Sequence, residues 1–214
     1  MLGSYYEASE MYEKALRLMW VNRKERQEFI AQLYNNMGIC FKARGKKRQA
    51  QKLYEESYRI KSQVFGKDDI QTLETLLNIA ALHDEQGCFT KAKLYYDEII
   101  EALKLNKLQD TPLFAETLQN KAISFFNLAN YPRALQSFNE SLDAKKQIYG
   151  NVHVSVANTL QNMALVYHRQ GQYKKSLALY EEAIKIYQKK LGSQHHMVKI
   201  IQENYNHTKK FAGK

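Results

Sequence analysis

Apolar residues recur with helical spacing throughout this chain. Tyr34, Gly38 and Phe41 are separated by four and three residues, the spacing that places side chains on one face of a helix. After a glycine, Ala50, Leu53, Tyr54 and Ser57 form a second such stripe. The first stripe returns as Leu76, Ala80 and His83, as Leu118, Ala122 and Phe125, and as Leu160, Ala164 and Tyr167. The pattern predicts pairs of amphipathic helices joined by short turns.

The pairs repeat with a fixed period. Asparagines stand 42 residues apart at Asn36, Asn78, Asn120, Asn162 and Asn204. Two glycine-rich columns keep the same step: Gly3, Gly45, Gly87, Ala129, Gly171 and Gly213 between the paired helices, and Gly66, Leu108, Gly150 and Gly192 at the end of each unit. A constant period of this size indicates a stacked array of helical units.

The period divides the chain into units of one continuous repeat domain, residues 1–214, with no linker composition inside it. The predicted parts are an orphan second helix at 1–29, four repeats at 30–71, 72–113, 114–155 and 156–197, and a capping helix at 198–214. The second helix is expected to reach Val64 in the first repeat and Leu191 in the last. Thr111 before Pro112 predicts a helix start, and Pro132 suits another.

The first helix predicted from this division is strongly apolar and has no partner before it. Its large side chains are Tyr5, Tyr6, Tyr12, Leu16 and Trp20. Bare apolar surface of this kind is typical of an interaction site. We therefore expect self-association, or contact with an upstream domain, through the N-terminal helix.

These residues resemble the tetratricopeptide repeat, and the 42-residue period with a glycine-containing connector is similar to the repeats of kinesin light chains. The matching positions include Gly150, His153, Val156, Ala157, Thr159, Leu160, Asn162 and Ala164. The resemblance implies an all-α, right-handed superhelical solenoid of helix-turn-helix units. It also implies a protein-interaction scaffold, with a role as a cargo or complex adaptor.

One face of each first helix is not needed for the predicted core. Stepping 100° per residue places the asparagine column on this face, which would line a concave groove. An amide side chain both donates and accepts hydrogen bonds, as the backbone of an extended peptide requires. The candidate peptide-binding residues are Asn35, Asn36, Ile39, Asn78, Ala81, Gln119, Asn120, Ile123, Phe126, Gln161, Asn162, Leu165, His168 and Arg169. Alternatively, the asparagines bond neighbouring helices and stiffen the stack.

The net charge of +10 leaves a second function open. Six cations lie around the first inter-helix turn: Lys42, Arg44, Lys46, Lys47, Arg48 and Lys52. Seven lysines lie near the C-terminus, from Lys185 to Lys214. Such patches attract nucleic acid or acidic surfaces, or remain simply solvated. Nucleic acid is the less favoured partner because the aromatic residues fall in core columns. A third alternative is a structural spacer in a larger assembly.

Catalytic motifs are absent from the sequence, which contains no phosphate loop, zinc-protease helix, Cys-x-x-Cys pair or nucleophile elbow. We therefore expect no enzymatic activity, no cofactor and no metal site. Cys40 and Cys88 are expected to remain reduced. The absence of a long apolar run and of a secretory signal predicts a cytoplasmic protein without a membrane span.

Overall fold

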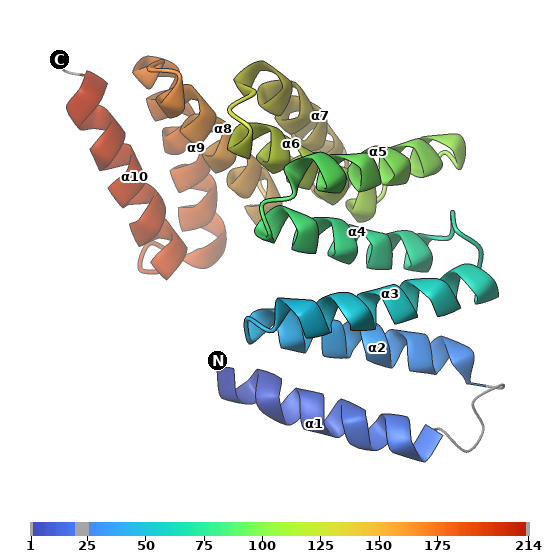
Figure 1. Cartoon of the computed structure of the whole chain (residues 1–214). Helices are drawn as coiled ribbons and strands as arrows, with labels where there is room; N and C mark the ends of the chain where they lie inside the picture. The colour runs from blue at the N-terminus through green and yellow to red at the C-terminus, as the bar shows by residue number, and fades with distance from the viewer. Residues whose placement is uncertain (1, 20–25, 213–214) are drawn as a thin grey trace. The chain divides into compact units, whose positions relative to one another are not determined.

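The computed structural model describes residues 2–19 and 26–212, and every regular element in these ranges is an α-helix (Figure 1). The elements are α1 Leu2–Met19, α2 Gln27–Ala43, α3 Lys47–Val64, α4 Ile70–Glu85, α5 Phe89–Leu105, α6 Pro112–Asn127, α7 Tyr131–Tyr149, α8 Val154–Arg169, α9 Tyr173–Leu191 and α10 His196–Ala212. The predicted all-α class is confirmed. The predictions made for Trp20 and Gly213 fall outside the described residues.

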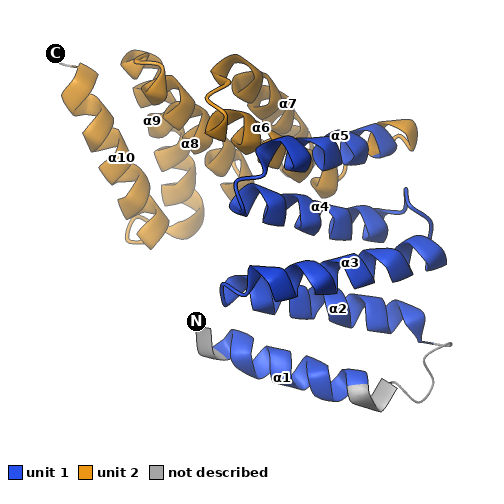
Figure 2. Cartoon of the chain, viewed as in Figure 1, with its two compact units in different colours: residues 1–102 blue, residues 103–214 orange. Residues whose placement is uncertain are grey.

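The helices group into two compact units (Figure 2). Unit 1 is Met1–Ala102 and unit 2 is Leu103–Lys214. Within unit 1, α2 packs against α1 and α3, and α3 packs against α4. Within unit 2, α6 packs against α7, α8 against α7 and α9, and α10 against α9. Both units therefore consist of helices that pack on their neighbours in the chain, as the repeat pattern predicts.

A column of large aromatic side chains fills the core of each pair. Tyr54 and Tyr96 in unit 1, and Phe138 and Tyr180 in unit 2, are almost completely buried. Burying a side chain of this size stabilises a fold by roughly 1.5–3 kcal/mol. Small residues on the facing helix make the space available. At Gly38 an added Cβ would lie 2.5 Å from the Tyr54 ring, so the ring occupies the space that a side chain at position 38 would need.

Local sequence signals place the helix ends where they were predicted. Thr111 Oγ1 accepts a hydrogen bond from the Phe114 N–H, and α6 begins at Pro112. Asn130 caps α7, whose second residue is Pro132. The second helices α3 and α9 end at Val64 and Leu191.

Among the described residues, the turns agree with the glycine columns except at Leu108 and Gly3. Ala129 adopts the left-handed conformation of its column with φ 56°, although it carries a Cβ. In the second column the left-handed residue of the repeat that contains α5 is Lys107, with φ 57°, and not the predicted Leu108. The Leu108 N–H instead donates to the Leu103 carbonyl and closes α5. Gly3 lies inside α1 rather than in a turn.

Candidate functional site

The structure places the predicted groove residues on the first helices of the pairs. Asn35, Asn36 and Ile39 lie on α2; Asn78 and Ala81 on α4; Gln119, Asn120, Ile123 and Phe126 on α6; Gln161, Asn162, Leu165, His168 and Arg169 on α8. Most of them are half-buried, Ile39 and Arg169 are exposed, and Asn35 is buried at 8% exposure. The half-buried residues are therefore partly accessible to solvent.

In unit 1 the amides of this face bond one another. The Asn78 Nδ2 donates to Asn35 Oδ1 at 3.0 Å, which ties α4 to α2. On α2 the Gln32 Nε2 donates to Asn36 Oδ1 at 3.1 Å. A hydrogen bond within the protein adds about 0.5–1.5 kcal/mol to its stability. The Asn78–Asn35 bond joins two helices, whereas the Gln32–Asn36 bond lies within α2.

In unit 2 a buried lysine changes this arrangement. Lys145 of α7 is 6% exposed and donates to Gln119 Oε1 and to Thr159 Oγ1, the latter at 2.9 Å. Thr159 Oγ1 also donates to Gln119 Oε1 at 2.9 Å. Gln119 lies 84 residues after Asn35, so it holds the position whose oxygen accepts from Asn78 in unit 1. Here that oxygen is bonded by the ammonium group and the hydroxyl.

The consequence falls on Asn162, which corresponds to Asn78. Its side chain is half-buried and makes no hydrogen bond to any other described residue. The half-buried side chain of Asn120 on α6 also has no hydrogen-bond partner among the described residues. Ile123 and Leu165 follow these asparagines by three residues and are half-buried beside them. Unit 2 therefore presents amides and apolar side chains together on the face formed by α6 and α8.

Burial controls the charge of Lys145. Desolvation lowers the pKa of its ammonium group to about 8, and nearby Glu116 opposes the shift. We did not predict Lys145 as part of this surface. The sequence signal that could have found it is a further 42-residue column, in which two lysines alternate with uncharged residues: Lys61, Leu103, Lys145 and Tyr187. The side chains of all four residues are buried in the structure. A lysine at a position that is apolar in another repeat indicates a buried polar contact.

At the end of α8 the predicted residues Leu165, His168 and Arg169 come together at a cavity of about 160 Å³. His168 Nδ1 lies 3.0 Å from Thr208 Oγ1 of α10. Burial lowers the pKa of His168, and the neighbouring His207 and Arg169 lower it further. His168 is therefore mainly a neutral hydrogen-bonding ring at pH 7.

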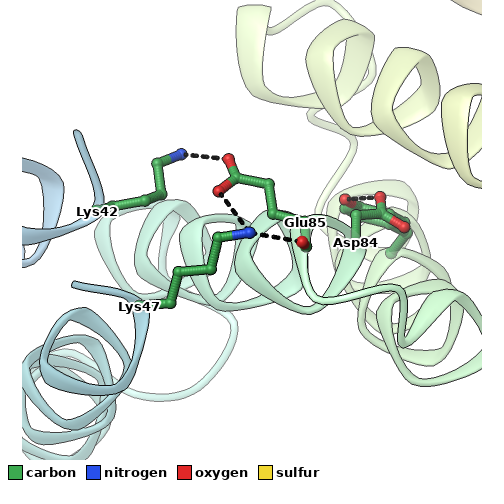
Figure 3. A network of polar contacts seen from close by, with 5 residues as sticks. Lys42, Lys47, Asp84 and Glu85 are labelled. Carbon is green, nitrogen blue, oxygen red and sulfur yellow. Dashed lines mark hydrogen bonds and ion pairs between the residues drawn. The ribbon is translucent and has the colours of Figure 1, made fainter. Parts of the chain in front are cut away.

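Part of the basic turn is occupied by contacts within unit 1 (Figure 3). Lys42 and Lys47 both form ion pairs with Glu85, and the Lys47 ammonium donates to the Glu85 backbone carbonyl at 2.6 Å. Arg44 lies over the Tyr6 ring at 4.6 Å. These contacts use cations that the electrostatic alternative needs for a ligand.

The repeat pattern and the helix pairs match a known family model, described as tetratricopeptide repeat, at residues 1–63, 29–104 and 113–189. The chain belongs to the tetratricopeptide repeat family. A comparison with curated protein sequences found no match. Within the described residues, no helix is long and apolar enough to cross a membrane.

Solved structures with a similar fold include BtubC (BKLC) from P. vanneervenii, with a TM-score of 0.83, 22% identity, and coverage of 100% of this chain and 85% of that one. Another is a putative kinesin light chain with nearly identical TPR-like repeats from Podosopora anserina (TM-score 0.74, 14% identity, 88% of each chain). A third is the Rap conjugation gene regulator of plasmid pLS20 in complex with the Phr* peptide (TM-score 0.73, 14% identity, 87% of this chain and 50% of that one). The resemblance to kinesin light chain repeats is confirmed at the level of the fold.

Proposed function

We propose that this protein is a non-catalytic interaction scaffold, a cargo or complex adaptor, in which unit 2 binds an extended segment of a partner protein along α6 and α8. The observation that carries the proposal is the state of the asparagine column. Asn120 and Asn162 lack partners among the described residues, whereas Asn35, Asn36 and Asn78 are bonded within unit 1. A half-buried amide without a partner is costly unless water or a ligand satisfies it.

The surface has the chemistry that an extended peptide needs. A peptide backbone presents N–H and C=O groups in turn, and an asparagine side chain can pair with both. Ile123 and Leu165 would contact the peptide side chains that point toward the helices. A protein of similar fold, the Rap conjugation gene regulator of plasmid pLS20, has been solved in complex with the Phr* peptide, which supports this class of partner.

The two asparagines lie on neighbouring helices. Gln119 of α6 and Thr159 of α8 share a hydrogen bond, so the two helices are neighbours. An extended chain advances roughly 3.3 Å per residue. We therefore expect one short segment to reach both amides.

The test begins with a displayed library of random dodecamer peptides, from which the purified protein selects a binder. That peptide is then synthesised and titrated calorimetrically into the wild-type protein and into Asn120→Ala and Asn162→Ala. We expect each substitution to weaken binding by about 1–3 kcal/mol, the penalty for leaving a desolvated backbone group unpaired. The midpoint of chemical unfolding should change little.

Two variants serve as controls. Asn78→Ala removes the corresponding amide of unit 1 and should leave peptide affinity within about two-fold, because that amide already bonds Asn35. Reversing Lys46, Lys47 and Arg48 to glutamate should also change affinity by no more than a few-fold. The proposal fails if the library yields no binder, if Asn162→Ala binds normally, or if binding collapses with the charge reversals and with added salt.

A further inference from the structure

Another column with the 42-residue period lies just before the first helices α4, α6, α8 and α10. It consists of Asp69, Thr111, His153 and His195. Each of these side chains caps its helix, because it accepts a hydrogen bond from a backbone N–H of the first turn. Such a bond satisfies a donor that the helix itself cannot pair. Two of the four caps are imidazole rings, and both belong to unit 2.

The two histidines make the same set of bonds. His153 Nδ1 accepts from the Ser155 N–H at 3.1 Å, and His195 Nδ1 accepts from the Met197 N–H at 3.2 Å. The backbone carbonyl of each histidine also accepts an N–H from the first turn of its helix. A backbone N–H can only donate, so Nδ1 is unprotonated in both rings and the proton of the neutral ring is on Nε2. The capping bond therefore exists only while the histidine is neutral.

The charges near these caps do not favour an imidazolium. Neither histidine forms an ion pair with a described carboxylate, and the first turns of α8 and α10 contain no acidic residue. The charged residues in the last turns of the preceding helices are Lys146 on α7, and Lys189 and Lys190 on α9. The positive end of a helix dipole also disfavours a cation at the helix N-terminus. Protonation of either ring therefore removes a hydrogen bond and places a positive charge where it is disfavoured.

The ring contacts of the two caps differ. The His153 ring stacks on Tyr149, the last residue of α7, with 4.4 Å between ring centroids. A tyrosine ring attracts a cation to its face, so this contact partly offsets the cost of protonation. The His195 ring lies 4.7 Å from the ring of His196. Imidazole rings gain a proton between about pH 8 and 5, so acid places a second positive ring beside His195. We therefore expect His195 to lose its capping bond more readily than His153.

We propose that His153 and His195 make the starts of α8 and α10 sensitive to pH. The neutral rings hold the first turns at about pH 7.5, and the capping bonds are lost as the rings are protonated toward about pH 5. The stabilising contribution of these caps is thus present at the higher pH and falls as the pH falls. The caps of α4 and α6 keep their bonds over this range, because an aspartate is ordinarily ionised throughout it and a threonine hydroxyl does not titrate.

The test follows single backbone amides of the whole protein by NMR. Hydrogen exchange of the Ser155 and Met197 amides is measured at about pH 7.5 and about pH 5.5, and each rate is divided by the rate of an unstructured chain at the same pH. We expect the protection of both amides to fall about five-fold at the lower pH, as for the loss of a typical helix cap, with the larger fall at Met197. The Gln71 and Phe114 amides, which Asp69 and Thr111 cap, should keep their protection.

Matched variants assign the effect to the two rings. His153→Asn and His195→Asn each keep a capping oxygen but remove the titration, so the pH dependence should disappear at the substituted cap and remain at the other. His207→Asn replaces an exposed histidine of α10 away from both caps and should leave the pH dependence unchanged.

Three results would overturn the proposal. They are unchanged protection of Ser155 and Met197 at the lower pH, equal pH dependence in the wild type and the two cap variants, and nitrogen NMR signals that place the proton on Nδ1 at about pH 7.5. The experiment contains no ligand, so its outcome is independent of the peptide function.

Discussion

Units 1 and 2 have related sequences and use the same positions differently. The amide pair of Asn78 and Asn35 in unit 1 corresponds to Asn162 and Gln119 in unit 2. In unit 1 the buried Lys61 donates to the backbone carbonyl of Gln71 and leaves the amides to each other. In unit 2 Lys145, 84 residues later, donates to Gln119 itself. The acceptor that the buried lysine bonds therefore determines whether the asparagine has a partner. Asn78 bonds Asn35 in unit 1, whereas in unit 2 Lys145 bonds Gln119 and Asn162 is left without a partner among the described residues.

The two units also share a buried serine hydrogen bond. Ser57 and Ser141 each donate a hydrogen bond of 2.7 Å to the backbone carbonyl of an alanine 26 residues earlier, Ala31 and Ala115. These bonds join the second helix of a pair to the first. The pairs α2–α3 and α6–α7 therefore share this link between their helices.

The largest expected effect concerns the pH dependence of stability at Lys145. The folded pKa of about 8 is below the unfolded value of 10.5. Below pH 8 both states carry the proton and burial of the charge penalises folding. As pH rises from 8 to 10.5 the folded lysine loses its proton first, so the wild type should gain on the order of 1–3 kcal/mol relative to Lys145→Met. Urea unfolding across this range measures the difference.

Lys61→Met is the matched control in unit 1. Burial also lowers the pKa of Lys61, but two carboxylates, Glu74 and Asp69, oppose the shift. We expect the same sign and a smaller pH dependence. If the stability difference between the wild type and Lys145→Met does not vary with pH, Lys145 is not the buried cation that distinguishes unit 2.

A smaller effect is expected at Gly38. Its equivalents in unit 2 are Ala122 and Ala164, but a Cβ at position 38 would lie 2.5 Å from the Tyr54 ring. Gly38→Ala should therefore destabilise the protein by about 1–2 kcal/mol, although alanine favours the helix. In unit 2, Ala122→Gly should cost about 1 kcal/mol through helix propensity alone. Chemical unfolding measures both, and a stabilising Gly38→Ala would show that the helices of this pair can separate without cost.

Tyr54 itself provides the next test. Its hydroxyl is buried and has no hydrogen-bond partner among the described residues, whereas the equivalent Phe138 of unit 2 carries no hydroxyl. Tyr54→Phe should stabilise the protein by about 1 kcal/mol, because it removes the desolvation penalty of an unpaired group. The reverse change, Phe138→Tyr, should destabilise it. The thermal midpoints of the two variants must move in opposite directions for this account to hold.

The smallest effect concerns the surface amides. Asn78→Ala breaks the bond to Asn35 and should lower stability by about 0.5–1.5 kcal/mol, while Asn162→Ala should change it by less than about 0.5 kcal/mol. The free energy of unfolding without peptide measures both. Equal losses would mean that Asn162 also supports the stack, and the distinction between the two units would disappear.

The sequence predicted those features that depend on residues close together in the chain. The caps at Thr111 and the ends of α3 and α9 follow from local chemistry and from the length of an apolar stripe. Local patterns predicted turn positions less accurately where the turn contains no glycine. At the end of α5 the left-handed residue is Lys107 instead of Leu108, because no glycine at this point fixes the register.

The sequence by itself determined the all-α repeat, its 42-residue period and the face on which the asparagines lie, because a helix converts spacing directly into direction. Only the tertiary structure decided which amides have partners. Lys145, Gln119 and Thr159 lie on three different helices. Which acceptor a long side chain bonds depends on distances and burial that exist only after those helices have packed. The end of α8 is similar, since the cavity of His168 and Arg169 is completed by side chains of α10.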